Sequence, residues 1–422
     1  MIVNGHRWRK KLGVLAAERL LVDIGTSSLT GVRVGALGQR TSKAIASHPI
    51  YETIALDAGD CALLGSDFQR AGCVYASPTP NDEDIFVDTY GVSWLWTDGF
   101  PAQLDHPLEK ASWQEIPKHR RPVLPNELQI ASVDHAMPVV ADAPCPGLLD
   151  TCFALRNGWS FLDDITENWR NASALLDWSQ ETISNAYEHM LTALPEQPDI
   201  VVYADDLGFQ GGMYLSDTDF RNFLYPRLKS VISHIRRHTD AAICLHSCGG
   251  VRSILSDFAD LGIEMLNLDF YAKGMEIAEV RRKIPKEMIL HGPVDLGAIG
   301  AAANRGERGA LAKYAVDMAE AGSSIAAPPD SISEAGFLDE CLVGADVVRE
   351  LDLDDMKTLR NIGPEKSIID KMVAAASKIR TPGISGENPR VVTMDRAHPP
   401  SGHAGGASQL IPVTEDGHTQ GT

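Results

Sequence analysis

From about residue 199 onward, short apolar or β-branched runs alternate with longer segments whose apolar positions recur with a helical period. A strand repeats its faces every two residues and a surface helix every three to four, so the two patterns are distinguishable. The predicted strands are 199–204, 241–245, 263–268, 288–290 and 323–327, and the predicted helices are 217–237, 251–260, 277–283 and 307–320. This alternation is typical of a parallel α/β fold, and its number of consecutive units favours a TIM-type (β/α)8 barrel.

The longest predicted helix, 217–237, carries its own start signal. Ser216 is suited to the N-cap, and Asp219 occupies the capping-box position three residues later. Pro226 cannot donate a backbone hydrogen bond within a helix, so we expect a kink there. Residues 145–195 also read as helical, and we expect Trp159 and Trp169 to be packing residues.

The rest of the chain is less regular. Residues 1–144 are rich in proline and aromatics, and we interpret them as an irregular N-terminal part that covers one barrel face. The regular βα units occupy 145–380, so that 1–380 forms one barrel domain. Residues 381–422 contain few large apolar side chains and cannot offset the entropy of ordering, so we expect a flexible, disordered tail.

Charge and cysteine content restrict the possible partners. The 57 acidic and 38 basic residues leave a formal charge of -19, which repels nucleic acid and anionic membrane surfaces. No apolar stretch is long enough to predict a membrane span or a signal core, so we expect a cytoplasmic protein. The seven cysteines are scattered along a chain large enough to fold without disulfides, and we expect reduced thiols.

Polar residues follow every predicted strand from 199 onward. In a barrel the loops after the strands meet on one face, where active sites form. The residues at these strand ends are Asp205, Asp206, His246, Cys248, Asp269, His291, Asp295 and Asp330.

His246 and Cys248 form the most informative pair. On an extended segment, two residues at this spacing point to the same side, so an imidazole nitrogen and a thiolate can bind one ion. Both suit zinc, whose catalytic sites keep one position open. The alternative is a hydrogen-bonded core histidine beside a packing thiol.

A catalytic zinc needs a further ligand, and each strand-end aspartate is a candidate. The adjacent pair Asp205 and Asp206 is costly to bury unless hydrogen-bonded or bound to a cation, although one of them could cap a helix.

The segment from about 144 to 351 resembles the uroporphyrinogen decarboxylase superfamily, specifically its branch of cobalamin-dependent methyltransferases. The resemblance is carried by several motifs in order. They are ADDLGFQGG (204–212), LYPRLK (224–229), HSCG (246–249), GM (274–275), HGPVD (291–295) and APPDSI (327–332), with LVDIGTSS (21–28) and DTYGVSW (88–94) nearer the N-terminus.

The resemblance implies a TIM-type barrel with a zinc ion held by His-x-Cys and a later cysteine, facing a corrinoid (cobalamin) on a partner protein. His246 and Cys248 match the first two ligands, and the third position falls on Asp330. A carboxylate there makes the site harder and favours oxygen- or nitrogen-bound methyl groups. Alternatively, Asp205 or Asp206 completes the shell.

Further site roles are expected at the same strand ends. We expect catalytic roles for Asp205, Asp206 and Asp269, and cofactor-binding roles for Gly249, Gly292 and Asp295. The expected partners are a small methylated substrate or thiol and a corrinoid-binding protein, with neither nucleic acid nor membrane. Aryl methyl ethers, methylamines, betaines and methylthiols all remain open as substrates.

Two other functions compete with methyl transfer. Uroporphyrinogen decarboxylase itself is metal-free and carries an N-terminal arginine-rich signature, which the stretch 7–11 (RWRKK) lacks. A barrel that binds metal or corrinoid without turnover is the third possibility, because fold does not determine function.

Overall fold

The computed structural model describes residues 7–15, 19–24, 64–75, 79–97, 100–129, 136–328, 332 and 335–378. Asp330 and the predicted tail lie outside the described residues.

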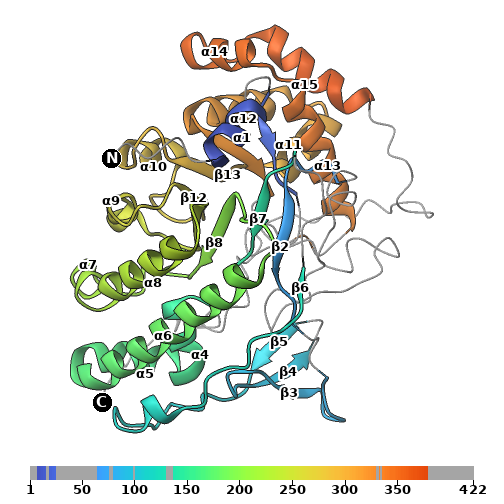
Figure 1. The fold of residues 1–422 in the computed structure, drawn as a ribbon. Coiled ribbons are helices and arrows are strands. Elements are labelled where there is room, and N and C mark those ends of the chain that lie inside the picture. Colours follow the sequence, from blue (N-terminus) through green and yellow to red (C-terminus); the bar gives the residue numbers. More distant parts are fainter. Residues whose placement is uncertain are drawn as a thin grey trace, which may run out of the picture.

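A curled sheet forms the centre of the described chain (Figure 1). It has nine strands, of which all but the edge strand β6 (Leu128–Gln129) run parallel. The eight parallel strands are β1 (Leu21–Val22), β2 (Gln69–Cys73), β7 (Val139–Ala141), β8 (Ile200–Ala204), β11 (Ala242–Ser247), β12 (Met265–Leu268), β13 (Ile289–Asp295) and β14 (Ser324–Ala327). From β2 to β14 they pair in chain order, and β14 then pairs with β1.

The two ends of this sheet meet through Asp67, just before β2. Its amide donates to the Val22 carbonyl, and its carboxylate accepts from the Val22 amide, both at 2.8 Å. The expected TIM-type α/β barrel is therefore confirmed.

The helices lie outside the sheet. Between β7 and β8 lie α4 (Leu148–Arg156), α5 (Gly158–Glu167) and α6 (Trp169–Ala193). The later connections contain η4 (Arg252–Ile254), α9 (Leu255–Asp260), α10 (Ile277–Lys283), α11 (Leu296–Asn304) and α12 (Arg308–Ala321). After β14 come α13 (Ala335–Arg349), α14 (Leu353–Asn361) and α15 (Lys366–Lys378). Trp159 and Trp169, in the first turns of α5 and α6, are each 56% exposed, contrary to expectation.

The predicted helix 217–237 is divided. It consists of α7 (Asp217–Asp219), a π-helical turn η3 (Phe220–Leu224) and α8 (Tyr225–His238). The Ser216 side chain accepts from the Asp219 amide at 3.1 Å, as the capping pattern predicts. Pro226 stands in the first turn of α8, where its missing N–H matters least, so the irregularity precedes the proline.

Helix α11 was not apparent in the sequence. Its run LGAIGAAAN contains two glycines, which are poor helix formers. Glycine is needed there because α11 packs closely against α13. A Cβ on Gly300 of α11 would lie 1.9 Å from the Glu340 carbonyl oxygen, and a Cβ on Gly344 of α13 would lie 1.9 Å from the Leu296 carbonyl oxygen. The glycines allow these two helices to approach backbone to backbone.

Residues 1–144 do more than cover a face of the barrel. They supply β1, β2 and β7, and the helix α1 (Arg7–Leu15). Next to them stand the antiparallel strands β3 (Ile85–Val87), β4 (Ser93–Thr97) and β5 (Phe100–Gln103), followed by the short η2 (Ile116–Lys118). Strand β2 was hard to predict because its sequence, QRAGC, is polar although every residue is buried.

The barrel interior has an apolar floor. Trp8 and Leu12 of α1 cluster with Val202 of β8, Cys244 of β11 and Met265 of β12. Because side chains alternate along a strand, the interior positions further along β11 and β12 are His246 and Asn267. The apolar floor is therefore overlaid by a polar layer at the carboxyl ends of the strands. Within the described residues no helix is both long and apolar enough to cross a membrane.

Candidate metal centre

Three possible metal ligands converge at the carboxyl ends of β8 and β11. The Cys248 sulfur and the Asp206 Oδ1 atom each lie 3.6 Å from His246 Nε2. One ligand atom from each residue lies within 4.8 Å of the other two. His246 is 8% exposed, while Cys248 and Asp206 are half-buried, so the group borders solvent.

A backbone contact holds the sulfur and the carboxylate together. The Cys248 amide donates to Asp206 Oδ1 at 2.8 Å, and the Asp206 amide donates to Asp150 Oδ2 at 3.2 Å. Asp206 is therefore oriented by the loop after β11 and by the first turn of α4, which are far apart in sequence.

The second ring nitrogen of His246 faces Asn267 on the neighbouring strand. His246 Nδ1 and Asn267 Oδ1 are 2.5 Å apart. On its other side, Asn267 Nδ2 lies 2.9 Å from His291 Nδ1 and 3.2 Å from the His291 carbonyl oxygen. A carbonyl can only accept, so the amide nitrogen of Asn267 must face His291 and its oxygen must face His246. His246 consequently carries its proton on Nδ1, and the Nε2 lone pair points toward Cys248 and Asp206.

The polar chain ends in a buried ion pair. His291 Nε2 donates to Asp23 Oδ2 at 2.9 Å, and Arg70 contacts Asp23 Oδ1 at 2.6 Å. Burial acts to raise the pKa of Asp23, but the positive charge of Arg70 and the His291 contact outweigh it and lower that pKa to about 2. Strands β11, β12 and β13, with residues at β1 and β2, thus contribute one connected layer.

Asp205 points away from this group and caps α4. Its carboxylate accepts from the amides of Leu148, Leu149 and Asp150 at 2.9–3.1 Å, and from the Tyr203 hydroxyl at 3.0 Å. Burial raises the pKa of Asp205 to about 7, against the lowering effect of these hydrogen bonds. The capping alternative considered for one aspartate thus applies to Asp205.

The nearby Asp150 carboxyl is also buried. Burial, together with the charges of Asp206 and Asp205, raises the pKa of Asp150 well above its usual range. Three carboxyl groups therefore share this end of the barrel, which favours a cation over a polyanion there.

The other expected site residues have local structural partners. Asp269 accepts from Gln210 Nε2 at 2.5 Å and from the Tyr271 amide at 3.0 Å, so it shapes the loop after β12. Asp295 is the N-cap of α11, accepting from the Ala298 amide at 3.0 Å.

Both expected cofactor-binding glycines have positive φ. At Gly249 φ is +79°, and a Cβ would lie 2.2 Å from the Gly208 carbonyl carbon. Gly249 thereby lets its loop pack against the hairpin of β9 (Gly208–Phe209) and β10 (Gly212–Met213). At Gly292 φ is +65°, and a Cβ would lie 3.4 Å from the Asn267 Nδ2 atom. These contacts explain the glycines structurally.

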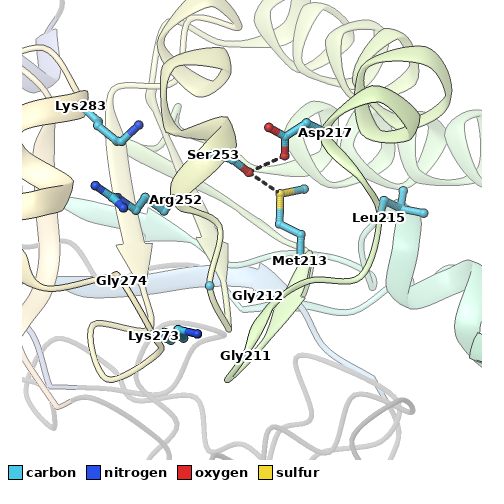
Figure 2. A pocket seen from close by; sticks show the side chains of 11 residues that line it. Gly211, Gly212, Met213, Leu215, Asp217, Arg252, Ser253, Lys273, Gly274 and Lys283 are labelled. Carbon is cyan, nitrogen blue, oxygen red and sulfur yellow. Dashed lines mark hydrogen bonds between the residues drawn. The ribbon is translucent and has the colours of Figure 1, made fainter.

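A groove of about 570 Å³ opens beside this hairpin (Figure 2). Gly250, two residues after Cys248, forms part of its lining. Three cationic side chains, Arg252, Lys273 and Lys283, line it together with Asp217. Arg252 pairs with Glu279 at 2.9 Å, whereas neither lysine has an ion-pair partner within the described residues.

Sequence reasoning missed Asn267, Arg70 and Asp150. One signal was present: Asn267 is the only amide in the run IEMLNL and has the same strand face as Met265. Arg70 and Asp150 gave none, because their burial becomes apparent only once distant segments are assembled.

Comparisons with known proteins agree with this architecture. Residues 131–305 match the family model described as uroporphyrinogen decarboxylase (URO-D). Among solved structures the chain is similar to a methyltransferase from Methanosarcina mazei, with a TM-score of 0.51 and 21% identity over 80% of this chain and 97% of that one. No curated protein matches at a significant level. At this identity the structural likeness shows a shared fold. The family match, on a barrel of the kind that the sequence predicts, confirms the resemblance of this chain to the uroporphyrinogen decarboxylase superfamily.

Proposed function

We propose that this chain is a zinc-dependent methyltransferase that moves a methyl group between a small methylated substrate or thiol and a corrinoid carried by a partner protein. The observation that carries the proposal is the convergence of His246 Nε2, the Cys248 sulfur and Asp206 Oδ1 at the mouth of the barrel.

The donor set suits zinc. One nitrogen, one sulfur and one oxygen ligand leave a fourth tetrahedral position for substrate, which is the pattern of catalytic rather than structural sites. The hydrogen bond from His246 Nδ1 to Asn267 leaves the Nε2 lone pair available, as second-shell partners of metal-bound histidines do. Asp330 remains an alternative third ligand.

Zinc bound there would supply Lewis-acid chemistry, polarising a methylated heteroatom or stabilising a thiolate as the methyl group transfers. The hard oxygen ligand from Asp206 leaves more positive charge on the metal than a second thiolate would. We therefore favour oxygen- or nitrogen-bound methyl donors, such as aryl methyl ethers or methylamines, over methylthiols.

The basic groove supports a charged substrate or partner. It opens on the loop that carries Cys248, and Lys273 and Lys283 offer two amino groups to an anionic group. The chain carries a formal charge of -19 overall, so a groove lined by three cationic side chains would direct an anionic group to this part of the surface.

Decarboxylation of a tetrapyrrole fits the site less well. Asp150, Asp205 and Asp206 cluster at this end of the barrel, and burial and mutual repulsion already raise the pKa values of Asp150 and Asp205, so the ionised carboxylates of a polycarboxylate substrate would be disfavoured there. A barrel that binds metal without turnover would retain zinc yet transfer no methyl group from any donor.

The proposal is tested by metal analysis followed by a methyl-donor screen with cob(I)alamin. We expect purified protein to hold zinc, and His246→Ala or Cys248→Ala to lose both zinc and methyl transfer. Cys341→Ala is the matched control, because its thiol is fully buried in the outer helical layer. Full activity in either ligand variant would overturn the proposal.

The third ligand is decided by comparing two aspartate variants in the same assays. If Asp206 ligates, Asp206→Ala loses zinc while Asp330→Ala retains it. The reverse result would assign the position to Asp330.

A further inference from the structure

We propose that Glu188, His234 and His238 form a second metal site, for a divalent transition metal ion such as Zn²⁺ or Ni²⁺, on the outer helical layer. The three residues come from α6 and α8, which pack side by side (Figure 1). The site is separate from the barrel ligands, which lie at the ends of β8 and β11.

The geometry brings three ligand atoms together. His234 and His238 stand one turn apart on α8, with ring centroids 5.0 Å apart. Glu188 Oε2 of α6 lies 3.1 Å from His234 Nε2 and 3.9 Å from His238 Nε2. One atom from each residue lies within 4.8 Å of the other two.

The chemistry of these ligands selects the class of ion. Two imidazoles favour zinc, nickel or copper over calcium or magnesium, which prefer oxygen. Histidines at this spacing share one helix face, as in known zinc motifs on helices. The side chains are 16%, 25% and 51% exposed for His234, His238 and Glu188, so an ion can enter from solvent and retain water ligands.

The position at the end of α8 adds to the attraction. His238 is the last residue of that helix, where the partial negative charge of the carbonyl groups favours a cation. An ion held there would connect α6 to α8, and α8 leads directly into β11, which carries His246. Bound metal would therefore stabilise the folded barrel by mass action.

Arg237 opposes the ion in the metal-free protein. It donates to His234 Nδ1 at 2.6 Å, which places the neutral ring proton on Nε2, facing Glu188. Metal binding at Nε2 requires that proton to move to Nδ1 and Arg237 to withdraw. Arg237→Gln should therefore tighten binding by about two- to fivefold, the size of an exposed charge interaction.

The test is a zinc titration of the full-length apoprotein at pH 7.5, followed by calorimetry, with nickel as a second probe. Wild type should bind two equivalents, and His234→Ala/His238→Ala one. Loss of an outer-shell partner weakens metal binding about tenfold or more, so loss of a single direct ligand in His238→Ala should do at least as much to the outer site. His189→Gln is the matched control on α6, because His189 contacts the Pro125 carbonyl instead.

The variants at the two sites distinguish this proposal from the proposed function. Cys248→Ala should lose the barrel equivalent and retain the outer one. If Cys248→Ala binds no zinc, or if His234→Ala/His238→Ala binds as much as wild type, the second site does not exist, whatever the fate of methyl transfer.

Discussion

Replacement of Asn267 by alanine tests the link between the polar layer and the metal ligands. Asn267 is 7% exposed and connects His246 Nδ1 to the ring and carbonyl of His291. Each buried polar group left without a partner costs roughly 1–3 kcal/mol. Asn267→Ala should therefore lower the free energy of unfolding of the apoprotein by about 2–4 kcal/mol, and lower zinc affinity by about 10–100-fold as the imidazole loses its orientation.

Asn267→Asp separates these two effects. A carboxylate can still accept from His246 Nδ1, and carboxylate partners of metal-bound histidines are common. It cannot donate to His291, and it faces the His291 carbonyl oxygen. We therefore expect near-normal zinc affinity in a destabilised protein.

The assays are urea unfolding in the presence of a chelator and competition for zinc with a chromophoric chelator. The reasoning is refuted if Asn267→Ala binds zinc as tightly as wild type. It is also refuted if Asn267→Asp loses as much zinc affinity as Asn267→Ala, because the acceptor would then be irrelevant.

Three further predictions concern stability. Gly249→Ala should lower the free energy of unfolding by more than about 3 kcal/mol, because the new Cβ would collide with backbone atoms. Gly262 has the same φ of +79° but open space around it, so Gly262→Ala should cost only the roughly 1–2 kcal/mol of the left-handed conformation. Equal losses of stability in urea unfolding would contradict this. Arg70→Met removes one partner of a buried ion pair and should cost about 3–5 kcal/mol by the same measurement; an unchanged free energy of unfolding would contradict this. The pKa of Asp23 is about 2 in the folded protein and near 4 in the unfolded chain, so its ionisation contributes about 2 kcal/mol of stability that is present above pH 4 and lost as the pH falls through 2. Asp23→Asn should therefore flatten the dependence of the free energy of unfolding on pH between about 4 and 2. An unchanged pH dependence would argue against the ion pair of Asp23 with Arg70.

The sequence by itself determined the α/β alternation and the pairing of His246 with Cys248. Both depend on local periods: a buried strand is a short apolar run, and residues two apart on a strand share a side. The parallel strands β8, β11, β12, β13 and β14 therefore begin within two residues of the predicted positions, although β13 continues to Asp295. The hairpin of β9 and β10 was not predicted, and β2 and α11, whose composition contradicts their state, were not apparent.

Tertiary structure decided which groups accompany that pair. Asp205 and Asp206 are neighbours in sequence, yet one caps α4 and the other faces His246, because the chain turns at the end of β8. Asp23 and His291 are 268 residues apart and meet only because β1 pairs with β14, which in turn pairs with β13. Strand register, which no local pattern encodes, thus selects the partners that orient His246 toward Cys248 and Asp206.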